Sequence, residues 1–190
     1  MNQFELRAAQ VTANGLRCRD IEILQVNVGL CCNQSCAHCH LQASPTRDEM
    51  MDWPTMESVL RAARAVPAAL VDVTGGAPEL HPDFRRFLQS VRASGSRAQV
   101  RTNLTVLLEP TMRYLPAFLR DLEVQLVGSL PCYLEDNVNA QRGNGVYDRS
   151  IRAIQRLNAV GYGVEPDLPL NLVYNPGGPF LPPNQSELEA

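Results

Sequence analysis

The stretch that decides the fold is residues 25–40, which reads QVNVGLCCNQSCAHCH. It begins within the apolar run Ile21–Val28, which has the length and composition of a buried strand. The cysteines Cys32, Cys36 and Cys39 follow in one short loop, with the spacing Cys-x-x-x-Cys-x-x-Cys. Thiolates are soft ligands, and a four-iron cluster held at three corners keeps one iron open for another ligand. The loop therefore predicts chemistry at an open iron.

Outward from this loop, strand-like runs alternate with segments of helical period. The further runs are Ala69–Val73, Ala98–Arg101, Val124–Val127 and Leu168–Val173. Apolar residues at i, i+3, i+4 and i+7 predict three helices with buried stripes: Met56, Val59, Leu60 and Ala63; Phe84, Phe87, Leu88 and Val91; Leu115, Phe118, Leu119 and Leu122. A fourth helix is expected to bury Tyr147, Ile151, Ile154 and Leu157. This order predicts about five strand-helix units of an α/β fold with parallel strands, as an open sheet or a barrel.

The helix ends are also marked in the sequence. Asp52 followed by Pro54 is typical of a helix start. Gly95 and Gly161 stand just past the expected ends of the second and fourth helices.

Composition limits the possible functions. A chain of 190 residues with 45% hydrophobic content forms one globular domain, and a net charge of −3 gives no electrostatic reason to expect nucleic acid or a membrane surface as partner. All 17 basic residues are arginine, which excludes lysine Schiff-base chemistry and the P-loop lysine. Six cysteines behind an N-terminus without signal-peptide features indicate a reducing compartment, so we expect a cytoplasmic protein.

The cysteine loop has other interpretations. Cys36-Ala37-His38-Cys39-His40 matches the attachment pattern of covalent haem, but that chemistry needs an export signal. Structural zinc could use the three cysteines with His38 or His40, although such sites usually combine ligands from two separate knuckles. A thioredoxin-like Cys36/Cys39 redox pair belongs at a helix start. A zinc-stabilised binding module remains the alternative outside the enzymes.

Five separate segments together are similar to one family, the arsenosugar-biosynthesis radical S-adenosylmethionine proteins. They are residues 25–40, 43–45 (ASP), 74–79 (TGGAPE), 129–133 (SLPCY) and 171–179 (NLVYNPGGP). The resemblance covers nearly the whole chain. It implies a partial (β/α) barrel. We expect a lead-in at residues 1–20, the barrel core at residues 21–178 and a tail at residues 179–190. Because nothing helical follows the fifth strand, the barrel looks unfinished and the chain looks truncated.

The resemblance also implies cofactors and residues that bind them. A [4Fe-4S] cluster on Cys32, Cys36 and Cys39 would bind S-adenosylmethionine at its open iron. Gly75, Gly76 and Ala77 match the superfamily positions that hold the amino group of the methionine moiety, although Ala77 stands where a glutamate is usual and Glu79 could replace it. Both glycines could instead serve a tight turn, and Glu79 could be a solvent-exposed acid. Other expected contacts lie at strand ends: Thr102, Asn103 and Ser129 for ribose and carboxylate, and Asn175 for adenine.

The expected activity is reductive cleavage of S-adenosylmethionine and transfer of its 5′-deoxyadenosyl radical to dimethylated arsenic(III). Cys132 is the expected catalytic residue, because arsenic(III) is soft and prefers thiolate; as a small buried hydrophobe it would instead belong to the core. The expected partners are dimethylarsenite and an electron-donor protein such as flavodoxin or ferredoxin. A radical enzyme that abstracts hydrogen from a peptide or another metabolite is the alternative.

The remaining cysteines and histidines have weaker assignments. Cys31 could assist the cluster loop, and Cys18 is interpreted as filler. His38 stands where the superfamily usually has an aromatic residue near the cluster. His40 and His81 are expected to be structural, His81 as a helix-entry residue before Pro82.

Overall fold

The structure is a computed structural model that describes residues 2–11, 20–66, 70–175 and 183–188. Its centre is one parallel sheet in which every strand pairs with the next strand along the chain, in the order β1-β2-β3-β4-β5. The strands are β1 (Ile23–Asn27), β2 (Leu70–Thr74), β3 (Arg97–Thr102), β4 (Gln125–Ser129) and β5 (Leu170–Val173). The five predicted strands are therefore confirmed, with ends that differ by a few residues.

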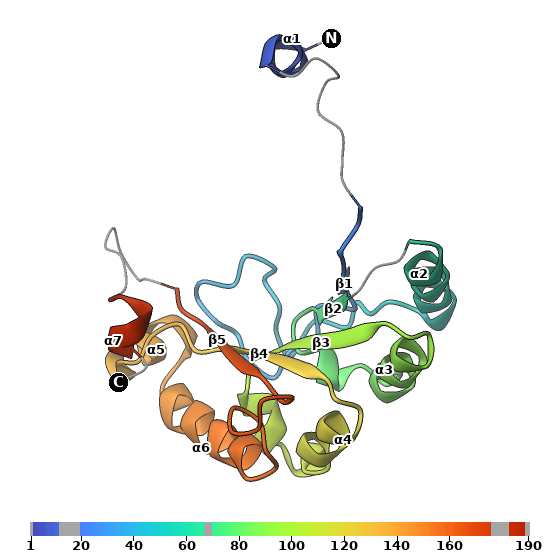
Figure 1. The fold of residues 1–190 in the computed structure, drawn as a ribbon. Helices are drawn as coiled ribbons and strands as arrows, with labels where there is room; N and C mark the ends of the chain where they lie inside the picture. The colour runs from blue at the N-terminus through green and yellow to red at the C-terminus, as the bar shows by residue number, and fades with distance from the viewer. Residues whose placement is uncertain (1, 12–19, 67–69, 176–182, 189–190) are drawn as a thin grey trace.

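Helices cover one face of this curved sheet. Figure 1 shows α2 (Trp53–Ala65), α3 (Phe84–Ala93), α4 (Leu115–Asp121) and α6 (Val146–Asn158) along the outer side. The short 3-10 helices η1 (Pro78–Leu80), η2 (Thr105–Leu108) and η3 (Pro110–Met112) lie in the connections. The arrangement confirms the α/β class, and its curvature is that of a partial barrel.

The core lies between the sheet and these helices. Strand residues Val71, Val73 and Val100 pack there with Phe87 and Leu88, and all of them are fully buried. The predicted stripe of α3 is completely buried, and α2 starts where expected because the Asp52 side chain accepts a hydrogen bond from the Thr55 amide at 3.0 Å. The stripes of α2 and α4 are only mostly correct, because Val59, Phe118 and Leu122 are half-buried.

The predicted buried face of α6 is only partly correct: Leu157 is buried as expected, but the other buried residues lie about one position away from the predicted ones. The buried residues are Val146, Ser150, Ala153 and Leu157, whereas Tyr147, Ile151 and Ile154 are only half-buried. Ala153 and Leu157 belong to the main core, and α6 packs against η2 and α5. Ser150 can be buried because its hydroxyl donates to the Val146 carbonyl at 2.8 Å.

Three further helices were not predicted. α5 (Glu135–Arg142) precedes α6, while α1 (Gln3–Val11) lies in the lead-in and α7 (Gln185–Leu188) in the tail. α1 buries none of its residues. Cys18 and residues 176–179 of the resemblance lie outside the described residues. Among the described helices, none is long and apolar enough to cross a membrane.

Candidate cluster and cofactor site

The cysteine loop is fastened by backbone hydrogen bonds on both sides. The Val28 amide donates to the Thr74 carbonyl of β2 at 3.0 Å, and the Met51 amide donates to the Val28 carbonyl at 2.9 Å. Within the loop, the Cys32 amide donates to the Ser44 carbonyl at 3.1 Å. These bonds hold the cysteines above the carboxyl end of β1, the end at which parallel barrels carry their sites.

The three predicted ligand thiols line one cavity of about 780 Å³ on the inner side of the sheet. Cys32 is buried, while Cys36 and Cys39 are half-buried. Six of the predicted cofactor-binding residues line the same cavity: Gly75, Gly76, Thr102, Asn103, Ser129 and Asn175. The structure therefore brings the residues that follow all five strands to one place.

Burial changes the chemistry of Cys32. Its side chain accepts a hydrogen bond from Asn103 Nδ2 at 3.4 Å, and Cys36 Sγ donates to Gln34 Oε1 at 3.5 Å. Burial raises the pKa of the Cys32 thiol more than the hydrogen bonds to it lower that pKa. Burial therefore favours the neutral thiol of Cys32 over its thiolate.

A buried arginine that the sequence did not indicate lies beside this loop. Arg142 of α5 donates from Nη2 to Gln34 Oε1 and to the Asn103 carbonyl, both at 2.7 Å, and from Nη1 to the Ser129 carbonyl. Burial lowers the pKa of Arg142, and the neighbouring Cys36 and Cys32 act to raise it. A buried cation facing cysteines suits a centre that carries negative charge.

The donor set fits a cubane cluster. Three soft thiols from one loop line one cavity beside a buried guanidinium, which would offset the charge of three thiolates. Among the described residues, no three His, Cys, Asp or Glu side chains are placed to hold a single metal ion. Cys32, Cys36 and Cys39 would hold such a cluster and leave one iron without a protein ligand.

Asn103 ties the cysteine loop to the connection after β3. Its Oδ1 accepts from the Val106 amide at 3.0 Å, and its Nδ2 donates to Asn33 Oδ1 at 2.7 Å. Thr102 likewise accepts from the Leu104 amide at 3.1 Å. Both side chains therefore serve as local caps, and both still line the cavity.

The glycine pair contacts protein backbone. The Gly76 amide donates to the Gly29 carbonyl at 2.9 Å, and the Ala77 amide donates to the Cys31 carbonyl at 2.8 Å. A Cβ on Gly76 would overlap the Cys31 carbonyl, and a Cβ on Gly75, at φ +156°, would stand 2.8 Å from the Gly29 carbonyl oxygen. Glycine is needed here first for docking onto the cysteine loop, whatever else the pair binds.

A polar network that the apolar strand pattern concealed lies on the inner face of the sheet, where Gln25 and Arg101 line the cavity. Asp72 in the middle of β2 accepts from Gln25 Nε2 at 2.8 Å, from Gln99 Nε2 at 2.9 Å and from Arg101 Nε at 2.9 Å. Burial acts to raise the pKa of Asp72, but these hydrogen bonds and the Arg101 charge outweigh burial and lower it. Side chains at the neighbouring positions of each strand point to the opposite face of the sheet, into the core. In the sequence, only the alternation of side chains along each run could have indicated the polar face.

Cys132 lies beside the cavity instead of in its wall. It is 3% exposed and packs with Val138 and Val146, next to Tyr174, which does line the cavity. Its sulfur accepts from the Leu134 amide and from Asn137 Nδ2, both at 3.4 Å. Burial acts to raise the pKa of Cys132, but these hydrogen bonds outweigh burial and lower it.

Glu79 is not the solvent-exposed acid of the alternative interpretation. It is 3% exposed, and neither carboxyl oxygen has a hydrogen-bond partner among the described residues. Burial raises its pKa to about 7, although the neighbouring Thr102 hydroxyl acts in the opposite direction. Glu79 and Ala77 are not among the residues that line the cavity.

The histidines differ in role. His81 is buried, and both of its ring nitrogens have hydrogen-bond partners. Its Nε2 lies 2.8 Å from the Met51 carbonyl, and its Nδ1 accepts from the Asp83 amide at 3.0 Å. These contacts agree with a structural role before α3. His38 and His40 both line the cavity, and His38 Nδ1 lies 3.1 Å from the Gln141 carbonyl. Cys31 is half-buried and does not line this cavity.

Fold and site together define an α/β half-barrel with a three-cysteine cluster loop at the carboxyl end of its first strand. A family model described as the radical SAM superfamily matches residues 26–177. The chain belongs to this superfamily, whose members use a [4Fe-4S] cluster and S-adenosylmethionine.

Individual relatives agree with this assignment. The chain is 28% identical to the mycofactocin maturase MftC of Mycobacterium tuberculosis over 133 residues, which are 69% of this chain and 33% of MftC. It is 24% identical to a probable GTP 3′,8-cyclase of Thermoplasma volcanium over 145 residues, 75% of this chain and 43% of the cyclase. The chain thus spans less than half the length of these relatives.

Solved structures show the same fold. Streptococcus suis SuiB bound to its precursor peptide SuiA superposes with a TM-score of 0.64 at 19% identity, covering 80% of this chain and 32% of SuiB. The enzyme anSMEcpe with bound S-adenosylmethionine gives 0.64 at 16% identity, covering 82% and 43%. At this identity the likeness supports the fold alone.

Proposed function

We propose that this chain cleaves S-adenosylmethionine reductively and delivers the 5′-deoxyadenosyl group to a dimethylated arsenic(III) compound. The observation that carries the first half is the cavity lined by the thiols of Cys32, Cys36 and Cys39 beside the buried charge of Arg142. When bound, the cluster and the cofactor supply one-electron cleavage of the carbon-sulfur bond. The chain's own residues bind and orient the cofactor and the substrate, and they exclude water from the cavity.

The residues around the cavity suit the polar parts of S-adenosylmethionine. Gly75 and Gly76 line the cavity, and their backbone carbonyls would offer acceptors to its ammonium group. Ser129 and Asn175 offer side-chain partners at the far wall for the ribose and adenine. Arg101 contributes a cation whose charge is balanced by Asp72 at 2.9 Å, so the inner face of the sheet can face a carboxylate without a large net charge.

The arsenic half rests on the family resemblance and on Cys132. Its sulfur lies 4.0 Å from the hydroxyl of Tyr174, a residue of the cavity wall, so a movement of Tyr174 would connect the thiol to the cofactor cavity. Hydrogen bonds that lower its pKa favour the thiolate, which is the form that binds arsenic(III). We assign Cys132 to capture of the arsenical, next to the place where the deoxyadenosyl group is released.

A second candidate is a peptide-modifying radical enzyme. It is supported by the similarity to the maturase MftC and by the shared fold with SuiB, which was solved with a precursor peptide. Such an enzyme would keep the same cluster and cofactor residues. Cys132 would then be a buried core thiol.

The two candidates differ in their products. Reconstituted protein, reduced and given S-adenosylmethionine with dimethylarsenite, is expected to give methionine and an adenosyl-arsenic adduct by mass spectrometry. Cys132→Ser should lose the adduct and keep methionine release, because a hydroxyl is a hard ligand. Cys31→Ser, a half-buried cysteine outside the cavity, is the matched control. If wild type forms only 5′-deoxyadenosine with or without the arsenical, the peptide candidate is favoured.

A further inference from the structure

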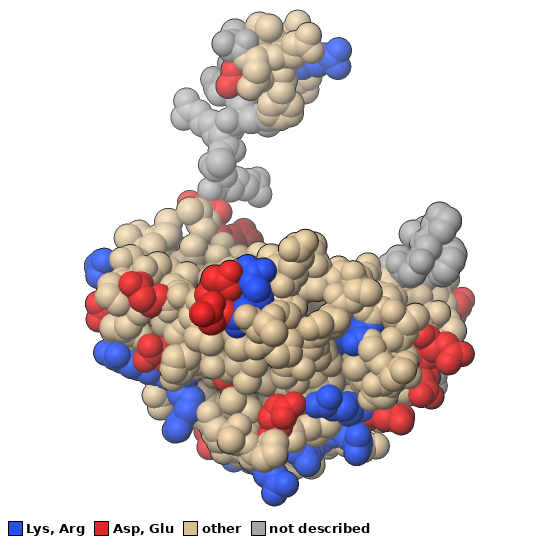
Figure 2. Space-filling model, turned by 180° about the vertical axis from the view of Figure 1, so that it is seen from behind, with Lys and Arg blue, Asp and Glu red and all other residues tan. Residues whose placement is uncertain are grey.

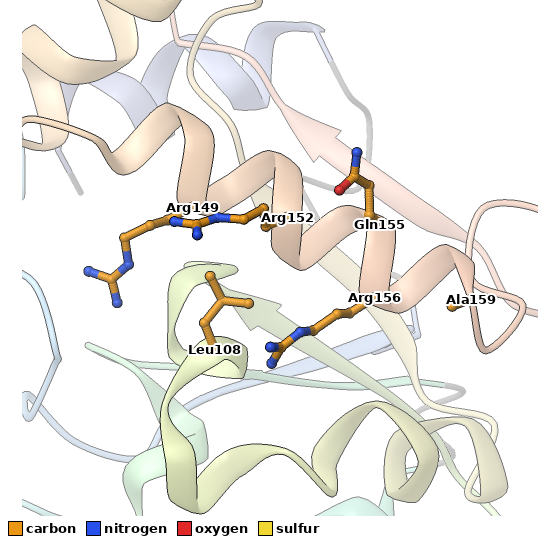
Figure 3. A pocket seen from close by; sticks show the side chains of 6 residues that line it. All are labelled: Leu108, Arg149, Arg152, Gln155, Arg156 and Ala159. Carbon is orange, nitrogen blue, oxygen red and sulfur yellow. The ribbon is translucent and has the colours of Figure 1, made fainter.

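A second pocket lies on the outer side of the molecule, away from the cofactor cavity. It has a volume of about 510 Å³ and is lined by Leu108 of η2 and by residues of α6: Arg149, Arg152, Gln155, Arg156 and Ala159. Figure 3 shows the arginines extending from α6 over the turn that holds Leu108. Among the described residues, three guanidinium groups and no carboxylate line the pocket.

The charge of this arginine pocket is only partly neutralised. Arg149 pairs with Glu109 at 3.1 Å, and Arg156 donates to the Leu107 carbonyl at 3.3 Å. Arg152 is exposed and has no hydrogen-bond or ion-pair partner in the part of the chain that the structure describes. In the view from behind, arginine side chains gather along the lower edge of the molecule (Figure 2). A chain of net charge −3 therefore presents a local cationic surface here.

The pocket is connected to the cysteine loop by continuous polar contacts. Glu109 Oε1 accepts from Arg149 on one side and from Asn33 Nδ2 on the other, both at 3.1 Å. Asn33 Oδ1 in turn accepts from Asn103 Nδ2 at 2.7 Å, and the same Nδ2 donates to Cys32 Sγ at 3.4 Å. Four contacts thus lead from the outer arginine to a predicted cluster ligand.

We infer that the arginine pocket is the docking surface for the acidic one-electron carrier that supplies the cluster. This inference rests on the proposed function, because cleavage of S-adenosylmethionine takes up one electron from outside. The carrier is oxidised by one electron, and the site is reduced by one. A negatively charged protein surface complements the arginines, and the polar contacts place its docking point on the path to Cys32.

Charge reversal tests docking without any turnover. Titration calorimetry with a flavodoxin, on the cluster-free protein at low salt, is expected to show binding that weakens steeply with added salt. The double substitution Arg152→Glu and Arg156→Glu should weaken this binding at least about tenfold. The matched control is Arg61→Glu with Arg64→Glu on α2, two exposed arginines whose reversal changes the net charge equally. Binding that is unchanged in the first pair, or weakened equally in both pairs, overturns the inference.

A kinetic arm separates docking from the proposed function. Reconstituted wild type and the Arg152→Glu/Arg156→Glu variant should cleave S-adenosylmethionine equally when a photoreduced deazaflavin supplies electrons. With reduced flavodoxin the variant should be slower by a similar factor of about ten at low salt. Wild type that fails with both reductants refutes the proposed function, whereas equal rates with flavodoxin refute the docking surface alone. If the pocket binds inorganic phosphate but no flavodoxin, it is a small-anion site and the inference is wrong.

Discussion

Arg142 Nη2 donates to the Gln34 side chain at 2.7 Å, which joins the last residue of α5 to the loop between Cys32 and Cys36. The two residues are 108 positions apart in the chain. The same guanidinium holds the carbonyls of Asn103 and Ser129, so one buried side chain connects the cysteine loop with the ends of β3 and β4. The shape of the cluster site therefore depends on a helix that the sequence did not predict.

Arg142→Met should damage both stability and cluster assembly. Loss of charged hydrogen bonds to buried acceptors is expected to cost about 2–3 kcal/mol in the free energy of unfolding. Iron content after anaerobic reconstitution should fall as well, because the positive charge beside the thiolates is gone. Urea unfolding and iron analysis measure the two effects. Arg97→Met, at an exposed arginine of β3, is the control, and equal behaviour of both variants would contradict the role of Arg142.

Gly76→Ala should reduce cluster content together with binding of S-adenosylmethionine. The new Cβ would overlap the Cys31 carbonyl, so the cysteine loop must shift before any ligand enters. Iron analysis and paramagnetic resonance with and without S-adenosylmethionine report the two properties. Cys31→Ser changes the neighbouring side chain without changing that carbonyl, and it should keep its cluster. Full iron content in Gly76→Ala would show that the loop does not depend on this glycine.

Glu79 should make the protein less stable as the pH rises. Its pKa is about 7 in the folded chain against 4.5 in the unfolded chain, so the folded state binds more protons between these values. The contribution of Glu79 to the free energy of unfolding is then fully present below pH 4.5. It is lost, by about 3 kcal/mol, as the pH rises through 7. Denaturant unfolding of Glu79→Gln should lose this part of the pH dependence. The exposed control Glu22→Gln should retain it, and identical pH profiles for Glu79→Gln and wild type would refute the assignment.

The strands and most of the helices that cover them were predictable because they depend on local patterns. Each strand is a short apolar run, and α2 and α3 each carry a regular buried stripe with recognisable ends. Parallel strands bring the residues that follow them to one edge of the sheet, so the sequence alone could group Thr102, Ser129 and the cysteine loop.

The missed features depend on contacts between distant segments. Arg142 gave no signal in the sequence, because its partner Gln34 lies 108 positions away. Asp72 was hidden within an apolar run, and its partners lie on the neighbouring strands β1 and β3. The face of α6 was only partly correct, because the larger apolar side chains Ile151 and Ile154 stay half-buried, whereas Ser150 and Ala153 are buried. Glu79 was expected either to replace the usual cofactor-binding glutamate or to face water, yet tertiary packing buries it away from the cavity wall.

The most direct test of the central claim is anaerobic reconstitution with iron and sulfide, followed by paramagnetic resonance of the reduced protein with and without S-adenosylmethionine. Wild type should hold a four-iron cluster whose spectrum changes when the cofactor binds the open iron. Serine at Cys32, Cys36 or Cys39 should abolish the cluster, while Cys31→Ser should not. A normal cluster in the triple serine variant, or stoichiometric zinc without iron in wild type, would contradict the account.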